Sequence, residues 1–117
     1  MIVEPRIAGL ERQLAASAHG VARFTFEELC ERPLGPSDYL RIARDYHTVL
    51  IDHVQMMEFE ERNPAKRFIS LIDALYDNKV KLMASAQAEP SAIYRSEEGV
   101  EAREFARTVS RIIEMGS

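Results

Sequence analysis

Three arginines near the end of the chain are spaced so that they could bind an anion. Arg103, Arg107 and Arg111 recur every four residues, which places them on one face of a predicted helix. Guanidinium groups bind phosphate and carboxylate through two parallel hydrogen bonds. Two hypotheses follow. The stripe is a solvated face neutralised by Glu104 and Glu114, or it contacts an anion such as the nucleotide of a neighbouring subunit.

A second candidate group lies at the ends of two predicted strands. Asp52 follows the aliphatic run 49–51, and Ser85 follows the run 80–84. The carboxyl ends of parallel strands are where open sheets bind ligands. One interpretation is the acid of an NTPase magnesium site with a phosphate-sensing hydroxyl. Another is a receiver-like phosphoacceptor, Asp52, with Ser85 as its hydroxyl partner. The third is that both residues only cap loops.

Several other sites are disfavoured by what the sequence lacks. It contains no G-x-x-x-x-G-K-[ST] phosphate loop, and His53 stands where a catalytic glutamate would follow Asp52. The sequence also lacks the acidic pair and the final lysine that a receiver needs. The histidines His19, His47 and His53 have no metal-ligand spacing, so no metal site is predicted. Cys30 is interpreted as a buried hydrophobic residue rather than a nucleophile.

Length and composition favour one globular domain. The chain has 117 residues, of which 46% are hydrophobic and 29% charged, with a net charge of -4. A disordered chain is excluded by this composition, and the single cysteine forms no internal disulfide. Mild acidity predicts no nucleic-acid partner. The short apolar runs predict no membrane span and no secretory signal, hence a cytoplasmic protein. The length is short for a complete NTP-hydrolysing core.

The predicted elements alternate between strands and helices. We expect strands at 21–24, 48–51 and 80–84, and helices at 26–31, 37–46, 64–77, 90–94 and 101–115. This order predicts right-handed crossovers and an α/β fold, with a small parallel sheet of about three strands covered by helices in three layers. Residues 21–117 form this module. Residues 1–20 are a separate segment, read as a helix at 7–18 or as extended chain.

Local signals suggest where the helices begin and end. Thr25 and Glu28 form a predicted capping box, and Ser37 and Asn63 are predicted N-caps. Asn78 is expected to end the predicted helix 64–77 in a left-handed conformation. Both later strands are predicted to be buried on both faces. The last helix should bury the apolar face opposite its arginines, formed by Ala102, Phe105, Ala106, Val109, Ile112 and Ile113.

Several long motifs occur in the order seen in one known family. They lie in the stretches Phe24–Tyr39, His47–Asp52, Arg67–Asp77, Val80–Ala86 and Phe105–Met115. Together these stretches resemble the C-terminal part of the ZapE/AFG-type ATPases, the P-loop proteins of bacterial division and mitochondrial maintenance. The resemblance covers nearly everything from Gly20 to the end. It implies a C-terminal portion of a P-loop ATPase.

The resemblance also implies what such a portion would work with. The family has an upstream half with the phosphate loop, the magnesium-site acids and the main sensor. ATP and magnesium are therefore implied for the complete protein and not for this chain alone. Arg107 and Arg111 match the family's R-T-x-S-R motif and, by resemblance, contact nucleotide on that half or on a neighbouring subunit. His53 and Gln55 depart from the family's second acid and proline, which weakens a metal role for Asp52.

Two further functions remain open beside the role in nucleotide sensing or subunit contact. A non-catalytic interaction module could bind a partner through the loop 58–62 and the arginine stripe. A receiver-like phosphoacceptor at Asp52 is the weaker alternative. The family link suggests a division or quality-control protein as the partner, and a homo-oligomer as the assembly.

Overall fold

The computed structural model describes residues 20–96 and 99–115, and the segment 1–20 lies outside the described residues except for Gly20. Strands and helices alternate as the sequence predicts. Two short 3-10 helices lie at Phe59–Glu61 and Pro90–Ala92. The main elements are β1 (Val21–Thr25), α1 (Phe26–Cys30), α2 (Pro36–Asp45), β2 (Thr48–Val54), α3 (Arg62–Asp77), β3 (Lys81–Ala86) and α4 (Gly99–Met115).

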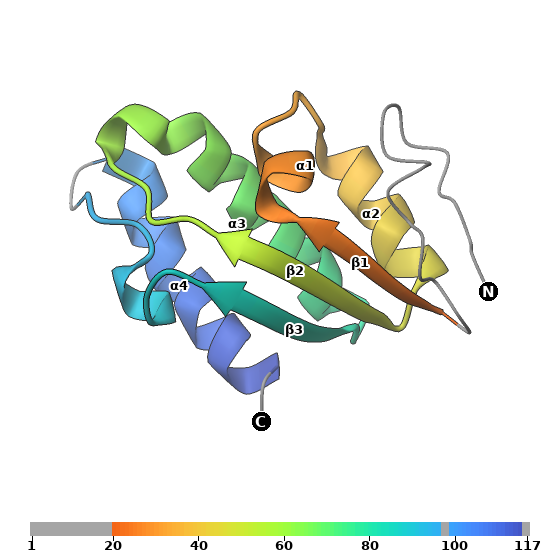
Figure 1. Ribbon diagram of the computed structural model, residues 1–117. Helices are drawn as coiled ribbons and strands as arrows, with labels where there is room; N and C mark the ends of the chain where they lie inside the picture. Colours follow the sequence, from red (N-terminus) through yellow and green to blue (C-terminus); the bar gives the residue numbers. More distant parts are fainter. Residues whose placement is uncertain (1–19, 97–98, 116–117) are drawn as a thin grey trace.

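The three strands form one parallel sheet in the order β1-β2-β3. The described helices all lie against the same face of this sheet (Figure 1). The opposite face carries Arg23, Leu50 and Met83, which are neighbours in the register, and Met83 is 61% exposed. The α/β fold with a three-stranded parallel sheet is confirmed. The prediction of three layers is wrong for the described part of the chain, which has two.

The core lies between the sheet and the helices. Ala22 and Phe24 of β1 and Val49 and Ile51 of β2 point into it and are almost completely buried. The Tyr39 hydroxyl donates a hydrogen bond of 2.6 Å to the Leu29 carbonyl, which joins α2 to α1. The largest side chains with almost no exposure are Tyr39, Phe24, Phe26, Leu29, Ile42, Ile51, Met57, Leu71 and Ile72.

The predicted capping box at α1 is confirmed. The Glu28 amide donates to the Thr25 hydroxyl at 3.2 Å, and the Thr25 amide donates to the Glu28 carboxylate at 2.8 Å. At α2 the prediction of Ser37 as the N-cap is wrong. The helix begins at Pro36, because the Asp38 carboxylate accepts from the Gly35 amide at 2.9 Å and makes Gly35 the N-cap, two residues before Ser37.

The ends of α3 differ from the prediction at both termini. The helix begins at Arg62, so Asn63 is not its N-cap and Pro64 is its third residue. This position tolerates proline because the first helical amides have no intrahelical partner. At the other end Asn78 has a φ of -100°, and the left-handed residue is Lys79, with a φ of 57°. The Asn78 side chain instead donates to the Ala74 carbonyl at 2.9 Å.

One prediction about burial is wrong and another holds only in part. The strand β3 is mostly exposed, because it lies at the edge of the sheet and only its preceding residue, Val80, is buried. In α4 Phe105 is buried as predicted, and Ala102, Val109 and Ile112 pack against the core. Ala106 and Ile113 are exposed instead, and Thr108 is buried. At about 100° per residue, the contact face is therefore rotated toward Arg111. No helix of the described residues is long and apolar enough to cross a membrane.

Candidate functional site

Arg107 and Arg111 meet one carboxylate on the neighbouring helix. Helix α4 packs beside α3, where Phe68 stacks on Phe105 with 5.9 Å between ring centroids. This packing brings the second half of α4 against Asp73. Arg107 Nη2 lies 3.2 Å from Asp73 Oδ2, and Arg111 Nη1 pairs with Asp73 Oδ1. Asp73 therefore holds both guanidinium groups at once.

Arg111 is held more firmly than Arg107. Its guanidinium lies over the Tyr76 ring, 4.7 Å from the centroid, and the Tyr76 hydroxyl donates to Glu114 at 3.0 Å. The hydrogen bond to Glu114, together with the negative charge of that carboxylate, raises the pKa of Tyr76. The Arg111 side chain is 25% exposed and that of Arg107 49% exposed. Arg107 is thus the more accessible of the two.

The charged groups of this cluster are two arginines and two carboxylates. Both guanidinium groups share Asp73, while Glu114 accepts from Tyr76, whose ring lies against Arg111. One of the two hypotheses from the sequence was that Glu104 and Glu114 neutralise the stripe. In the structure Asp73 does so, and Glu114 binds Tyr76. A phosphate or carboxylate could approach Arg107 without breaking the pair between Arg111 and Asp73.

Asp52 is already paired in the structure. Its Oδ2 lies 2.6 Å from Arg23 Nε, and the two residues lie on the adjacent strands β1 and β2. The hydrogen bond from Arg23 lowers the pKa of Asp52 below its ordinary value. The carboxylate is therefore held ionised by a neighbouring cation. This pairing fits a structural role better than that of a metal ligand or phosphoacceptor.

Ser85 stabilises an irregularity in β2. The pairing of β2 with β3 shifts between Ile51 and Val54, and His53 there has a φ of 63°. The His53 amide donates to the Ser85 hydroxyl at 3.0 Å, which satisfies a group that the bulge removes from regular pairing. Contrary to the prediction, the strand does not end at Asp52 but continues to Val54.

The four candidate residues do not form one site. Asp52 and Ser85 lie toward the carboxyl ends of β2 and β3. The arginine cluster lies on the helix layer, and Tyr76 lines a surface hollow with Lys81, which begins β3. The two groups therefore lie toward opposite ends of the sheet. A single ligand bound at the arginines would not be expected to reach Asp52.

No group of three His, Cys, Asp or Glu side chains that could hold a metal ion occurs among the described residues. Cys30 is completely buried, and burial raises the pKa of its thiol. This agrees with its interpretation as a hydrophobic core residue. Asp73 and Tyr76 are the residues that the sequence analysis overlooked. Their signal was an acid and a phenol at i and i+3 on the predicted helix 64–77.

The Asp52 pair should make stability depend on pH. The folded-state pKa of Asp52 lies below its unfolded value of about 3.9, so the pair stabilises the fold above that pH and loses this effect as pH falls. We expect Asp52→Asn to lower the unfolding free energy at pH 7 and to have a smaller effect at pH 3. Denaturant titration at both values measures this. An equal loss at both would contradict it, and Asp77→Asn is the control.

Comparison with known proteins places these features in context. The sequence profile described as AFG1-like ATPase matches residues 4–117. The chain is 40% identical over 90 residues to Lactation elevated protein 1 homolog B of Danio rerio, covering 74% of this chain and 18% of that protein. It is 36% identical over 93 residues to Cell division protein ZapE of Escherichia coli K12, covering 80% and 24%. No solved structure matches.

Proposed function

Because the chain belongs to the AFG1-like ATPase family, we propose that it acts as a C-terminal nucleotide-sensing or subunit-contact module of such an ATPase. The observation that carries this proposal is the cluster in which Arg107 and Arg111 share Asp73. The half-exposed guanidinium of Arg107 suits a phosphate group, because it keeps hydrogen-bond donors accessible to solvent. In this proposal the chain does not hydrolyse ATP by itself, since its sequence has no phosphate loop.

The complete ATPase would supply what this chain lacks. The chain spans about a fifth to a quarter of the length of the relatives named above. ATP and magnesium would bind the remaining part, either in the same polypeptide or in a neighbouring subunit of a homo-oligomer. Arg107 would then approach the nucleotide from outside that site. A cytoplasmic division or quality-control protein is the proposed partner, since one relative is a cell division protein.

Hydrolysis by the chain alone and by a complete protein tests this proposal. The 117-residue chain should release phosphate from ATP no faster than a blank without protein. A chimera of Escherichia coli ZapE, carrying this chain in place of its matched segment, should hydrolyse ATP. Steady-state phosphate release at saturating ATP and magnesium measures both. Hydrolysis by the isolated chain would overturn the proposal that it depends on another part.

An interaction module is the second candidate function. The open face of the sheet and its exposed edge favour it, because parallel sheets are ordinarily covered on both faces. In the loop 58–62, the Glu58 carboxylate pairs with Arg95 at 3.2 Å, and Arg62 lies over Phe59 at 4.9 Å. The loop is thus partly engaged with its own chain, so the sheet is the better candidate surface.

A further inference from the structure

The edge strand β3 presents an unusually apolar surface. Met83 is 61% exposed, and Ala84 and Ala86 are also exposed. Natural edge strands are commonly blunted by charge, proline or cover. In β3 the only charged residue is Lys81, at its first position, and no proline occurs. Among residues 20–96 and 99–115, nothing supplies the features that normally prevent another strand from pairing with this edge.

The backbone of β3 is oriented for such pairing. The Lys81 amide donates to the His47 carbonyl at 2.8 Å, and the Gln87 amide donates to the Val54 carbonyl at 3.0 Å. Successive residues of a strand direct their N–H and C=O groups to alternate sides. The amides of Leu82 and Ala84 therefore face away from β2, toward the open edge.

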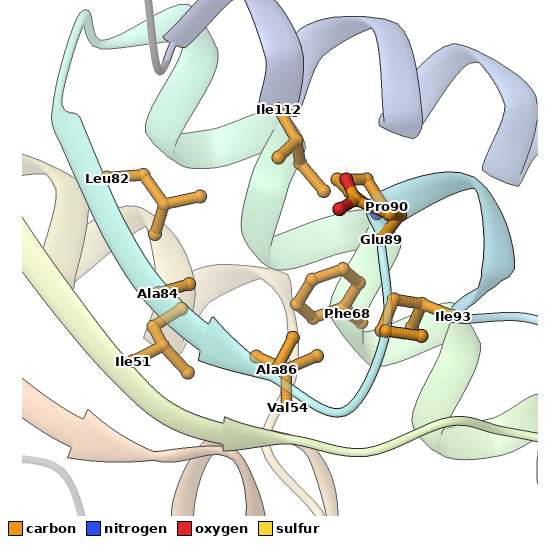
Figure 2. A pocket seen from close by; sticks show the side chains of 11 residues that line it. Ile51, Val54, Phe68, Leu82, Ala84, Ala86, Glu89, Pro90, Ile93 and Ile112 are labelled. Carbon is orange, nitrogen blue, oxygen red and sulfur yellow. The ribbon is translucent and has the colours of Figure 1, made fainter.

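A groove runs beside this edge. It has a volume of about 330 Å³, and apolar side chains from the sheet and the helix layer line it (Figure 2). Leu82, Ala84 and Ala86 line it from β3, and Ile112 from α4. The two alanines leave room that larger side chains would fill. A strand added beside β3 could place an apolar side chain here.

We propose that β3 is the docking edge for an extended strand from the remaining part of an AFG1-like ATPase polypeptide. The relatives are several times as long as the matched region, which covers 18% and 24% of two of them. They therefore contain ample chain to continue the sheet. The apolar groove and the outward amides suit a strand with alternating apolar side chains. This proposal rests on the family role proposed above, but not on the arginine cluster.

Backbone amide hydrogen exchange tests the docking edge directly. In the isolated 117-residue chain, the Leu82 and Ala84 amides should exchange at close to unstructured rates. In the ZapE chimera they should be protected at least about 100-fold, as amides in a paired strand are. Amides within α3 serve as the control and should be protected in both proteins. If the chimera does not fold, the aligned strand of Escherichia coli ZapE is measured instead.

A proline substitution separates edge pairing from folding. Ala84→Pro removes an amide that faces the edge, so the isolated chain should keep its circular dichroism spectrum. In the chimera it should return Leu82 to rapid exchange. The corresponding proline in Escherichia coli ZapE gives the same comparison.

Three outcomes would overturn the proposal. Rapid exchange of Leu82 and Ala84 in the folded complete protein would show that the edge stays open. Protection in the isolated chain that rises with protein concentration would assign the edge to a second copy of this chain. Protection that survives Ala84→Pro would show that something other than a paired strand covers it. Each differs from failure of the proposed function, because exchange is measured whether or not Arg107 affects hydrolysis.

Discussion

Replacing Phe68 with alanine should lower the unfolding free energy by about 3–5 kcal/mol. Phe68 is 3% exposed and lies at the centre of an aromatic cluster. Its ring centroid is 5.9 Å from that of Phe26 and 5.9 Å from that of Phe105, and Phe105 in turn contacts Tyr94 at 5.6 Å. The substitution removes the contact through which α1, α3 and α4 share one core. This loss is a large fraction of the roughly 5–15 kcal/mol that stabilises a typical domain.

Thermal and denaturant unfolding of the isolated chain measure this loss. For a domain of this size each kcal/mol corresponds to about 4–8 °C in Tm. Phe59→Ala is the matched control, because Phe59 lies outside the core cluster and contacts Arg62 at the surface. It should cost less than about 1.5 kcal/mol. If Phe68→Ala cost no more than Phe59→Ala, the aromatic cluster would not be the junction of the helices.

The sequence predicted the elements whose determinants are local. The capping box at Thr25 and Glu28 was predictable because donors and acceptors lie three residues apart. The β-branched and aliphatic runs likewise located all three strands. The predicted N-caps Ser37 and Asn63 were both wrong. At Ser37 a competing local hydrogen bond fixed where the helix begins, and at Asn63 the helix begins earlier, at Arg62. In α2 that bond is the one between Asp38 and Gly35.

The sequence could not predict what depends on distant packing. Asp73 meets Arg107 and Arg111 only because α4 is rotated toward α3, and these residues are 34 and 38 positions apart. Periodicity defines an apolar stripe but not the exact rotation of the helix. Burial of β3 was overestimated for a related reason. An apolar run shows that a strand suits a covered position, whereas exposure depends on which segments are present to cover it.

Substitutions in the arginine cluster should distinguish an effect on hydrolysis from an effect on stability. In the complete ATPase chimera, Arg107→Ala should lower kcat at least about tenfold, since an arginine that stabilises phosphoryl transfer can contribute far more. Stability should change little, because its ion pair with Asp73 is half-exposed. Arg103→Ala, one turn earlier on the same stripe, is the matched control and should leave kcat unchanged.

Arg111→Ala should give a different result from Arg107→Ala. It removes both the pair with Asp73 and the contact with Tyr76, so we expect a loss of about 1–2 kcal/mol in unfolding free energy as well as slower hydrolysis.

Asp73→Asn should then reveal what the carboxylate does. If the carboxylate only neutralises the arginines, its removal should make the cluster more positive and tighten ATP binding. If it positions Arg107, kcat should fall while the KM for ATP stays constant. If kcat were unchanged in both arginine variants, the cluster would serve only to hold α3 and α4 together.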